Sequence, residues 1–166
     1  YRADAVLVAT GRIRNSDSLN LAAAGVKVGP GGQIRVDKHQ RTSQPHIWAL
    51  GDVSSDRLLK HVANAEARTV AANLLIDGGE LAATDHRYIP HAVFTEPQIA
   101  AVGATEEQLQ EWGTPYVEFK QRYADVAFGW ALEDEGHFVK LLADPRTWHL
   151  LGAHIIGPQA ATLIQP

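Results

Sequence analysis

The chain has 166 residues, of which 45% are hydrophobic and 20% charged, so its composition is that of an ordinary globular protein. A net charge of −4, with scattered lysines and arginines, excludes a basic surface for nucleic acid or acidic membranes. Because the chain has no cysteine, a disulfide framework, a thiolate zinc site and a redox thiol are excluded within it. Short apolar runs and the lack of a charged leader predict no membrane span and a cytoplasmic location.

The first predicted element is a strand at residues 5–9, a continuous apolar run typical of a parallel sheet that is covered on both faces. It ends at Gly11 and Arg12, and a loop with one short helical turn is expected to follow. Residues 26–28 and 33–36 then alternate between apolar and polar on either side of a glycine-rich turn. This pattern predicts a hairpin.

Residues 47–53 are the most informative segment. The apolar run from Ile47 to Leu50 predicts a buried strand that ends directly before Gly51 and Asp52. A carboxylate at such a position is costly unless it binds something. A long helix is predicted at residues 58–76, closed by glycines, and its N-terminus offers free backbone N–H groups. The combination predicts a cofactor site, although an Asp can also simply cap the segment that follows it.

The second half has a different pattern, and a boundary near residues 78–86 separates it from the first. Short strands are predicted at residues 92–94, 99–102, 116–123, 138–142 and 150–156. A helix is predicted to begin at residues 105–108, because acidic side chains occupy its first turn. The order of elements indicates an antiparallel sheet flanked by helices, which is an α+β unit. Because the chain contains no methionine and ends within an expected helix, we expect it to be part of a longer chain.

Other kinds of site are not supported by the sequence. The eight histidines are scattered and show no metal-ligand spacing, so we expect no metal site. A glycine and an arginine after a strand can bind a phosphate or a ribose, but glycine also commonly ends strands. The chain contains no P-loop, no nucleophile elbow and no complete dinucleotide fingerprint.

Four segments together resemble the pyridine nucleotide-disulfide oxidoreductase family. They are residues 8–12, 49–53, 93–103 and 151–157. The resemblance implies an α/β plus α+β fold, in which a partial FAD-binding Rossmann-like segment precedes an antiparallel-sheet dimerisation domain flanked by helices. It also implies that residues 1–14 end an NAD(P)H-binding domain, residues 15–84 form the second FAD-binding segment and residues 85–166 begin the dimerisation domain.

The resemblance implies a reaction in which hydride passes from NADPH to FAD, and electrons then pass through a cysteine disulfide to a small disulfide substrate. The cofactor-binding positions that it implies are Gly11, Arg12, Gly51, Asp52, Leu58, Leu59, Lys60 and His61. Gly11 and Arg12 would border NADPH, and Asp52, in the family's Gly-Asp motif, would hydrogen-bond the ribityl region of FAD. The backbone at Lys60 and His61 would face the pyrimidine edge of the flavin. Leu58 or Leu59 would lie near the nicotinamide.

Within the family, residues 58–64, 85–90 and 123–131 are most similar to the mycothione reductase subfamily. The redox cysteine pair and the His-Glu base of the family lie outside this sequence, so the resemblance implies no catalytic residue within it. We therefore expect the isolated chain to be inactive. We also expect it to bind flavin weakly or not at all. A homodimer is implied for the whole protein. The alternatives are a dihydrolipoamide dehydrogenase and a non-catalytic dimerisation module.

Overall fold

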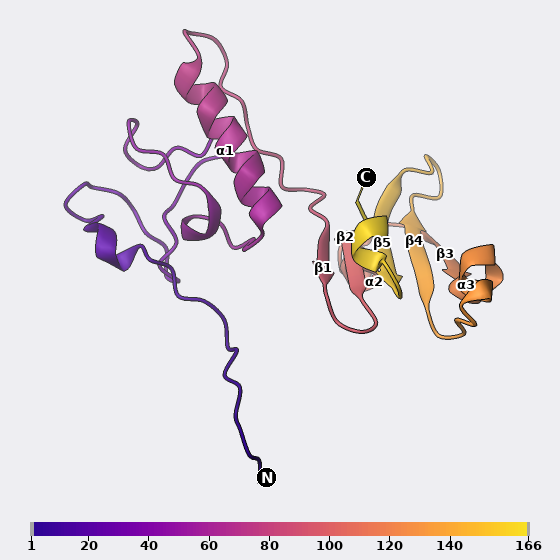
Figure 1. Ribbon diagram of the computed structural model, residues 1–166. Helices are drawn as coiled ribbons and strands as arrows, with labels where there is room; N and C mark the ends of the chain where they lie inside the picture. The colour runs from indigo at the N-terminus through magenta and orange to yellow at the C-terminus, as the bar shows by residue number, and fades with distance from the viewer. Residues whose placement is uncertain (1, 166) are drawn as a thin grey trace. The chain divides into compact units, whose positions relative to one another are not determined.

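The computed structural model describes residues 2–165, which divide into two compact units (Figure 1). The first unit ends at Asp85 and the second begins at His86. The first unit contains one long helix and many turns, and the second is built on an antiparallel sheet. No helix within residues 2–165 is long and apolar enough to cross a membrane.

The long helix of the first unit, α1, spans Lys60–Leu75 and confirms the helix predicted at residues 58–76. Its alanine-rich sequence favours helix, and its buried side chains follow a helical spacing. The buried residues are Val62, Glu66, Val70 and Asn73. Leu59 before the helix and Ile76 after it both have extended backbones, so the helix ends before the two glycines that were predicted to close it.

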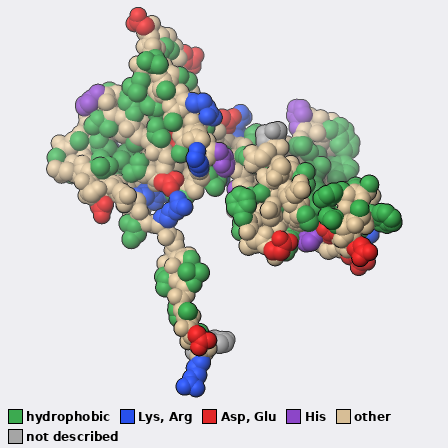
Figure 2. All heavy atoms as spheres, in the orientation of Figure 1, with side chains coloured by type: hydrophobic (Ala, Val, Ile, Leu, Met, Phe, Trp, Pro, Cys, Tyr) green, Lys and Arg blue, Asp and Glu red, His purple; other side chains and the backbone are tan. Residues whose placement is uncertain are grey.

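Two of the strands predicted in the first unit, at residues 5–9 and 47–50, are wrong. Within the described part of the chain, residues 5–9 pair with no strand, and Val6, Leu7 and Val8 are 75–90% exposed. Figure 2 shows apolar side chains along this N-terminal segment. Residues 47–50 form no strand among residues 2–165, and Trp48 takes part in an isolated bridge with Arg41. Both runs lack a neighbouring parallel strand among residues 2–165, and a strand is stable only when its backbone groups are paired.

The predicted hairpin is reduced to a tight loop with a single bridge, between Val28 and Ile34. The Gly29 N–H donates to the Gln33 carbonyl over 2.8 Å, which closes the turn. Two 3-10 helices, Asp17–Leu19 and Gly51–Val53, lie in the same unit. Its core consists of buried Val26, Ile34 and Ala49, with Leu21, Val36, Ile47 and Val53 packed against them.

The five strands predicted in the second half are confirmed. They are β1 (His91–Val93), β2 (Ile99–Gly103), β3 (Val117–Arg122), β4 (Phe138–Ala143) and β5 (Leu150–Ile156). All pairs are antiparallel, and the spatial order is β1-β2-β5-β4-β3. The central strand β5 places His154 between Ala101 of β2 and Lys140 of β4.

Three short helices accompany the sheet: α2 (Glu106–Glu111), α3 (Ala127–Ala131) and α4 (Ala160–Leu163). Thr105 begins α2 with a reciprocal capping box to Gln108, as the acidic first turn predicted. A 3-10 helix, Tyr123–Asp125, precedes α3. The core beneath α4 contains Ala100, Tyr123, Ile155, Ala160 and Ile164. An antiparallel sheet flanked by helices is therefore present.

Candidate functional site

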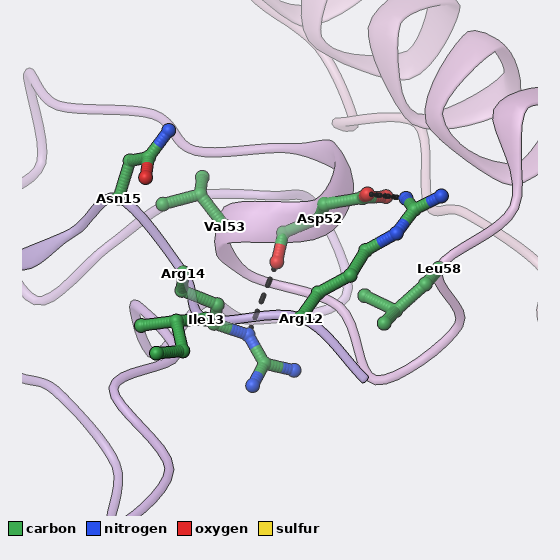
Figure 3. Close-up of a pocket in the computed structure, with 7 residues that line it drawn as sticks. All are labelled: Arg12, Ile13, Arg14, Asn15, Asp52, Val53 and Leu58. Atoms are coloured by element: carbon green, nitrogen blue, oxygen red, sulfur yellow. Dashed lines mark hydrogen bonds and ion pairs between the residues drawn. The ribbon is translucent and has the colours of Figure 1, made fainter. Parts of the chain in front are cut away.

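The first unit contains a pocket of about 450 Å³ that brings together three segments of the chain. Figure 3 shows its lining residues, which are Arg12, Ile13, Arg14, Asn15, Asp52, Val53 and Leu58. Three of the residues predicted to bind cofactors, Arg12, Asp52 and Leu58, therefore lie at one pocket. They are brought together although Arg12 and Asp52 are separated by 40 positions in the sequence.

Asp52 lies in the 3-10 helix Gly51–Val53 instead of at the end of a strand, and its side chain is 47% exposed. Gly51 turns the chain there with a φ of 71°, a left-handed conformation that favours glycine. The Gly51 carbonyl accepts hydrogen bonds from the N–H groups of Ser54 and Ser55. Neither this short helix nor α1 has a side-chain hydrogen bond at its N-terminal cap, so Asp52 caps neither of them.

The Asp52 carboxylate forms an ion pair with Arg12, whose Nη1 lies 2.8 Å from Oδ2. Figure 3 shows the Arg12 side chain extended toward this carboxylate. Figure 2 shows cationic and anionic side chains next to each other where the N-terminal segment meets the rest of the unit. The carboxylate can accept hydrogen bonds from hydroxyl groups, and the guanidinium can bind an anion such as phosphate.

Arg14 is a residue that the sequence reasoning missed. Its Nε donates to the Asp52 carbonyl over 3.0 Å, and its Nη2 donates to the Ser55 carbonyl over 2.9 Å. Nη2 also pairs with the Asp56 carboxylate at 2.7 Å, and Nη1 donates to the Gly31 carbonyl. The only signal in the sequence is its position two residues after Arg12, which does not reveal these backbone contacts.

Glu66 was also missed. It is 1% exposed, and its Oε2 accepts a hydrogen bond from the Gly51 N–H over 2.6 Å. The sequence offers one signal for it, because Glu66 falls on the same helical face as Val62 and Val70, four positions from each. A carboxylate on an apolar helix face requires a hydrogen-bonding partner.

The remaining predicted residues do not line the pocket. Gly11 has a φ of 114°, and a side chain built on it would meet no atom within 4 Å. Leu59 is the extended residue that precedes α1, and Lys60 and His61 are exposed in the first turn of that helix. The first-turn N–H groups lack partners within the helix, as in any helix, and are available to an acceptor.

The second unit has an ionic contact between Lys140 of β4 and Glu106 of α2. Hydrogen bonding between them lowers the pKa of Glu106 and raises the pKa of Lys140. Nearby, His154 Nε2 lies 3.0 Å from the Ala104 carbonyl. These contacts tie α2 and its preceding loop to the sheet. Over the described part of the chain, no three His, Cys, Asp or Glu side chains form a group that could hold a metal ion.

Comparison with known proteins gave two family matches. Residues 1–69 match the pyridine nucleotide-disulphide oxidoreductase family, and residues 89–166 match the dimerisation domain of the same family. Mycothione reductase from Mycobacterium tuberculosis is 54% identical over 167 residues, covering 99% of this chain and 36% of that protein. Dihydrolipoyl dehydrogenase from Haloferax volcanii is 38% identical over 165 residues, covering 99% of this chain and 34% of that protein.

A solved structure is also similar. It is the HOCl-induced flavoprotein disulfide reductase RclA from Escherichia coli, with a TM-score of 0.86 and 31% identity over 97% of this chain and 37% of that one. The chain therefore spans about a third of the length of the relatives that it matches. The resemblance stated from the sequence, including the similarity to mycothione reductase, is confirmed. The chain belongs to the pyridine nucleotide-disulphide oxidoreductase family.

Proposed function

We propose that these residues are part of a longer NADPH-dependent flavoprotein that reduces a low-molecular-weight disulfide, mycothione. The 54% identity to mycothione reductase across 99% of the chain is the observation that carries this proposal. In this proposal, FAD would supply the chemistry that accepts hydride from NADPH, and electrons would then reach the substrate through a cysteine disulfide. The redox cysteines and the catalytic base belong to other parts of the protein.

The residues at the pocket fit a flavin dinucleotide. The Asp52 carboxylate can accept hydrogen bonds from ribityl hydroxyls, and Leu58 offers apolar surface at the same pocket. The backbone N–H groups at Lys60 and His61 can donate to the pyrimidine edge of the ring, at the positive end of the α1 dipole. When bound, FAD supplies the hydride-accepting chemistry. In this proposal, Gly11 and Arg12 border NADPH, and Leu58 or Leu59 lies near the nicotinamide.

We assign residues 1–14 to the end of an NAD(P)H-binding domain, residues 15–84 to a second FAD-binding segment and residues 85–166 to the start of a dimerisation domain. The family match over residues 89–166 supports the last assignment. We accordingly propose a homodimer as the working form of the whole protein.

A steady-state assay of the full-length protein tests the proposed reaction. We expect oxidation of NADPH with mycothione as the disulfide substrate, and little reduction of NAD⁺ with dihydrolipoamide. The opposite preference would assign the protein to the dihydrolipoyl dehydrogenases, to which the chain is 38% identical. A full-length protein without flavin and without either activity would leave only a dimerisation module.

A further inference from the structure

We propose that Glu66 and Arg14 are positioning residues that hold the turn at Gly51 and Asp52 so that the Asp52 carboxylate faces the cofactor. The inference rests on the proposed flavin-binding function. The resemblance to the family did not single out either side chain. Each side chain forms a hydrogen bond with the backbone of the turn.

Glu66 holds the turn from the side of α1. Its buried carboxylate accepts the Gly51 N–H over 2.6 Å, a charge-assisted hydrogen bond inside a water-excluded contact. Close packing accompanies this bond, because a Cβ at Gly51 would lie 3.3 Å from the Ala63 side chain. The helix therefore fixes both the position and the left-handed conformation of Gly51, the residue directly before Asp52.

Arg14 holds the same turn from the side of the pocket. Its guanidinium donates to the carbonyls of Gly31, Asp52 and Ser55, which lie in two separate segments of the chain. A guanidinium is planar and its N–H groups have fixed directions, so simultaneous bonds to these carbonyls determine where each lies. The Arg14 side chain is only 16% exposed, in contrast to 68% for Arg12.

The two contacts leave one part of the turn able to rearrange. The backbone on either side of the Asp52 α-carbon is held, through the Gly51 N–H and the Asp52 carbonyl. The Asp52 carboxylate itself is half-exposed, and its ion-pair partner Arg12 is exposed as well. A ligand hydroxyl can therefore replace or join Arg12 at a carboxylate that is already oriented, which reduces the ordering cost of binding.

The test measures equilibrium binding of FAD to the full-length apoprotein, together with the melting temperature and the visible circular dichroism of the bound flavin. We expect E66A and R14Q each to weaken FAD binding about tenfold, the usual effect of losing a hydrogen bond to a charged group. E66Q keeps an acceptor oxygen at the same place, so we expect it to restore affinity to within about threefold of wild type. The matched controls E80Q and R68Q remove exposed charges and should change neither readout.

Wild-type affinity and an unchanged flavin spectrum in E66A and R14Q would overturn the proposal. It would also be overturned if affinity simply followed the melting temperature in every variant and E66Q gave no rescue, because both residues would then be merely structural. If E66A does not fold, R14Q decides the outcome at an unchanged melting temperature. A wild-type protein that binds no FAD would instead contradict the proposed function, and the inference with it.

Discussion

Arg12 Nη1 and Asp52 Oδ2 lie 2.8 Å apart, which joins the segment after Gly11 to the turn at residues 51–53. The resemblance to the family assigns Arg12 to the nicotinamide nucleotide and Asp52 to the flavin. In the structure these two side chains contact each other at a single pocket. Any ligand that takes the Asp52 carboxylate must therefore share it with Arg12 or displace Arg12 from it.

This ion pair is expected to contribute little to stability. Both side chains are largely exposed, at 68% and 47%, and exposed ion pairs are worth up to about 1 kcal/mol. We predict that R12Q lowers the free energy of unfolding in urea by no more than about 1 kcal/mol. A loss of several kcal/mol would show that the pair is structural.

Gly51 is expected to be intolerant of a side chain. Its φ of 71° is disfavoured for other residues by about 1–2 kcal/mol, and a new Cβ would also lie 3.3 Å from the Ala63 Cβ. We therefore predict that G51A lowers the free energy of unfolding by about 2 kcal/mol. G136A is the matched control, because no atom lies within 4 Å of a Cβ there. Equal stability of the two variants would contradict the described turn.

The sheet of the second unit depends on Leu142, which is fully buried in β4. We predict that L142A costs about 2–5 kcal/mol of unfolding free energy, since it removes apolar contacts and leaves a cavity. Leu150, at the start of β5, is 59% exposed, so L150A is the control and should cost less than about 1 kcal/mol. Denaturant unfolding of both variants measures the difference. Similar losses of unfolding free energy in L142A and L150A would contradict the burial of Leu142 in β4.

Asp134 should make stability fall in acid. Burial raises the pKa of its carboxyl, but hydrogen bonds from the His137 ring and backbone outweigh this effect and lower the pKa below its ordinary 3.8. A lowered pKa in the folded state stabilises the protein above pH 3.8, and this contribution is lost as the pH falls through the folded-state pKa. We predict that D134N has a shallower loss of melting temperature below pH 3.8 than wild type. If the melting temperatures of wild type and D134N fell identically in acid, the contact between Asp134 and His137 would be contradicted.

Elements that depend on local sequence patterns were predicted correctly, and features that depend on contacts between distant residues were not. The antiparallel strands of the second unit and α1 are predictable, because alternation and helical spacing are local patterns. The strands predicted at residues 5–9 and 47–50 do not form, because an apolar run becomes a strand only beside a pairing partner. Arg14 and Glu66 were missed because their contacts join residues that are 15–42 positions apart.

Asp52 is the residue on which the proposed function depends most directly. The decisive measurement is equilibrium binding of FAD to the full-length apoprotein and to its D52A variant, with D77A as an exposed control. We predict that wild type and D77A bind FAD equally and that D52A binds it about tenfold or more weakly, because the ribityl hydroxyls lose a charged acceptor. If D52A bound FAD as tightly as wild type, the assignment of this pocket to the flavin would be contradicted.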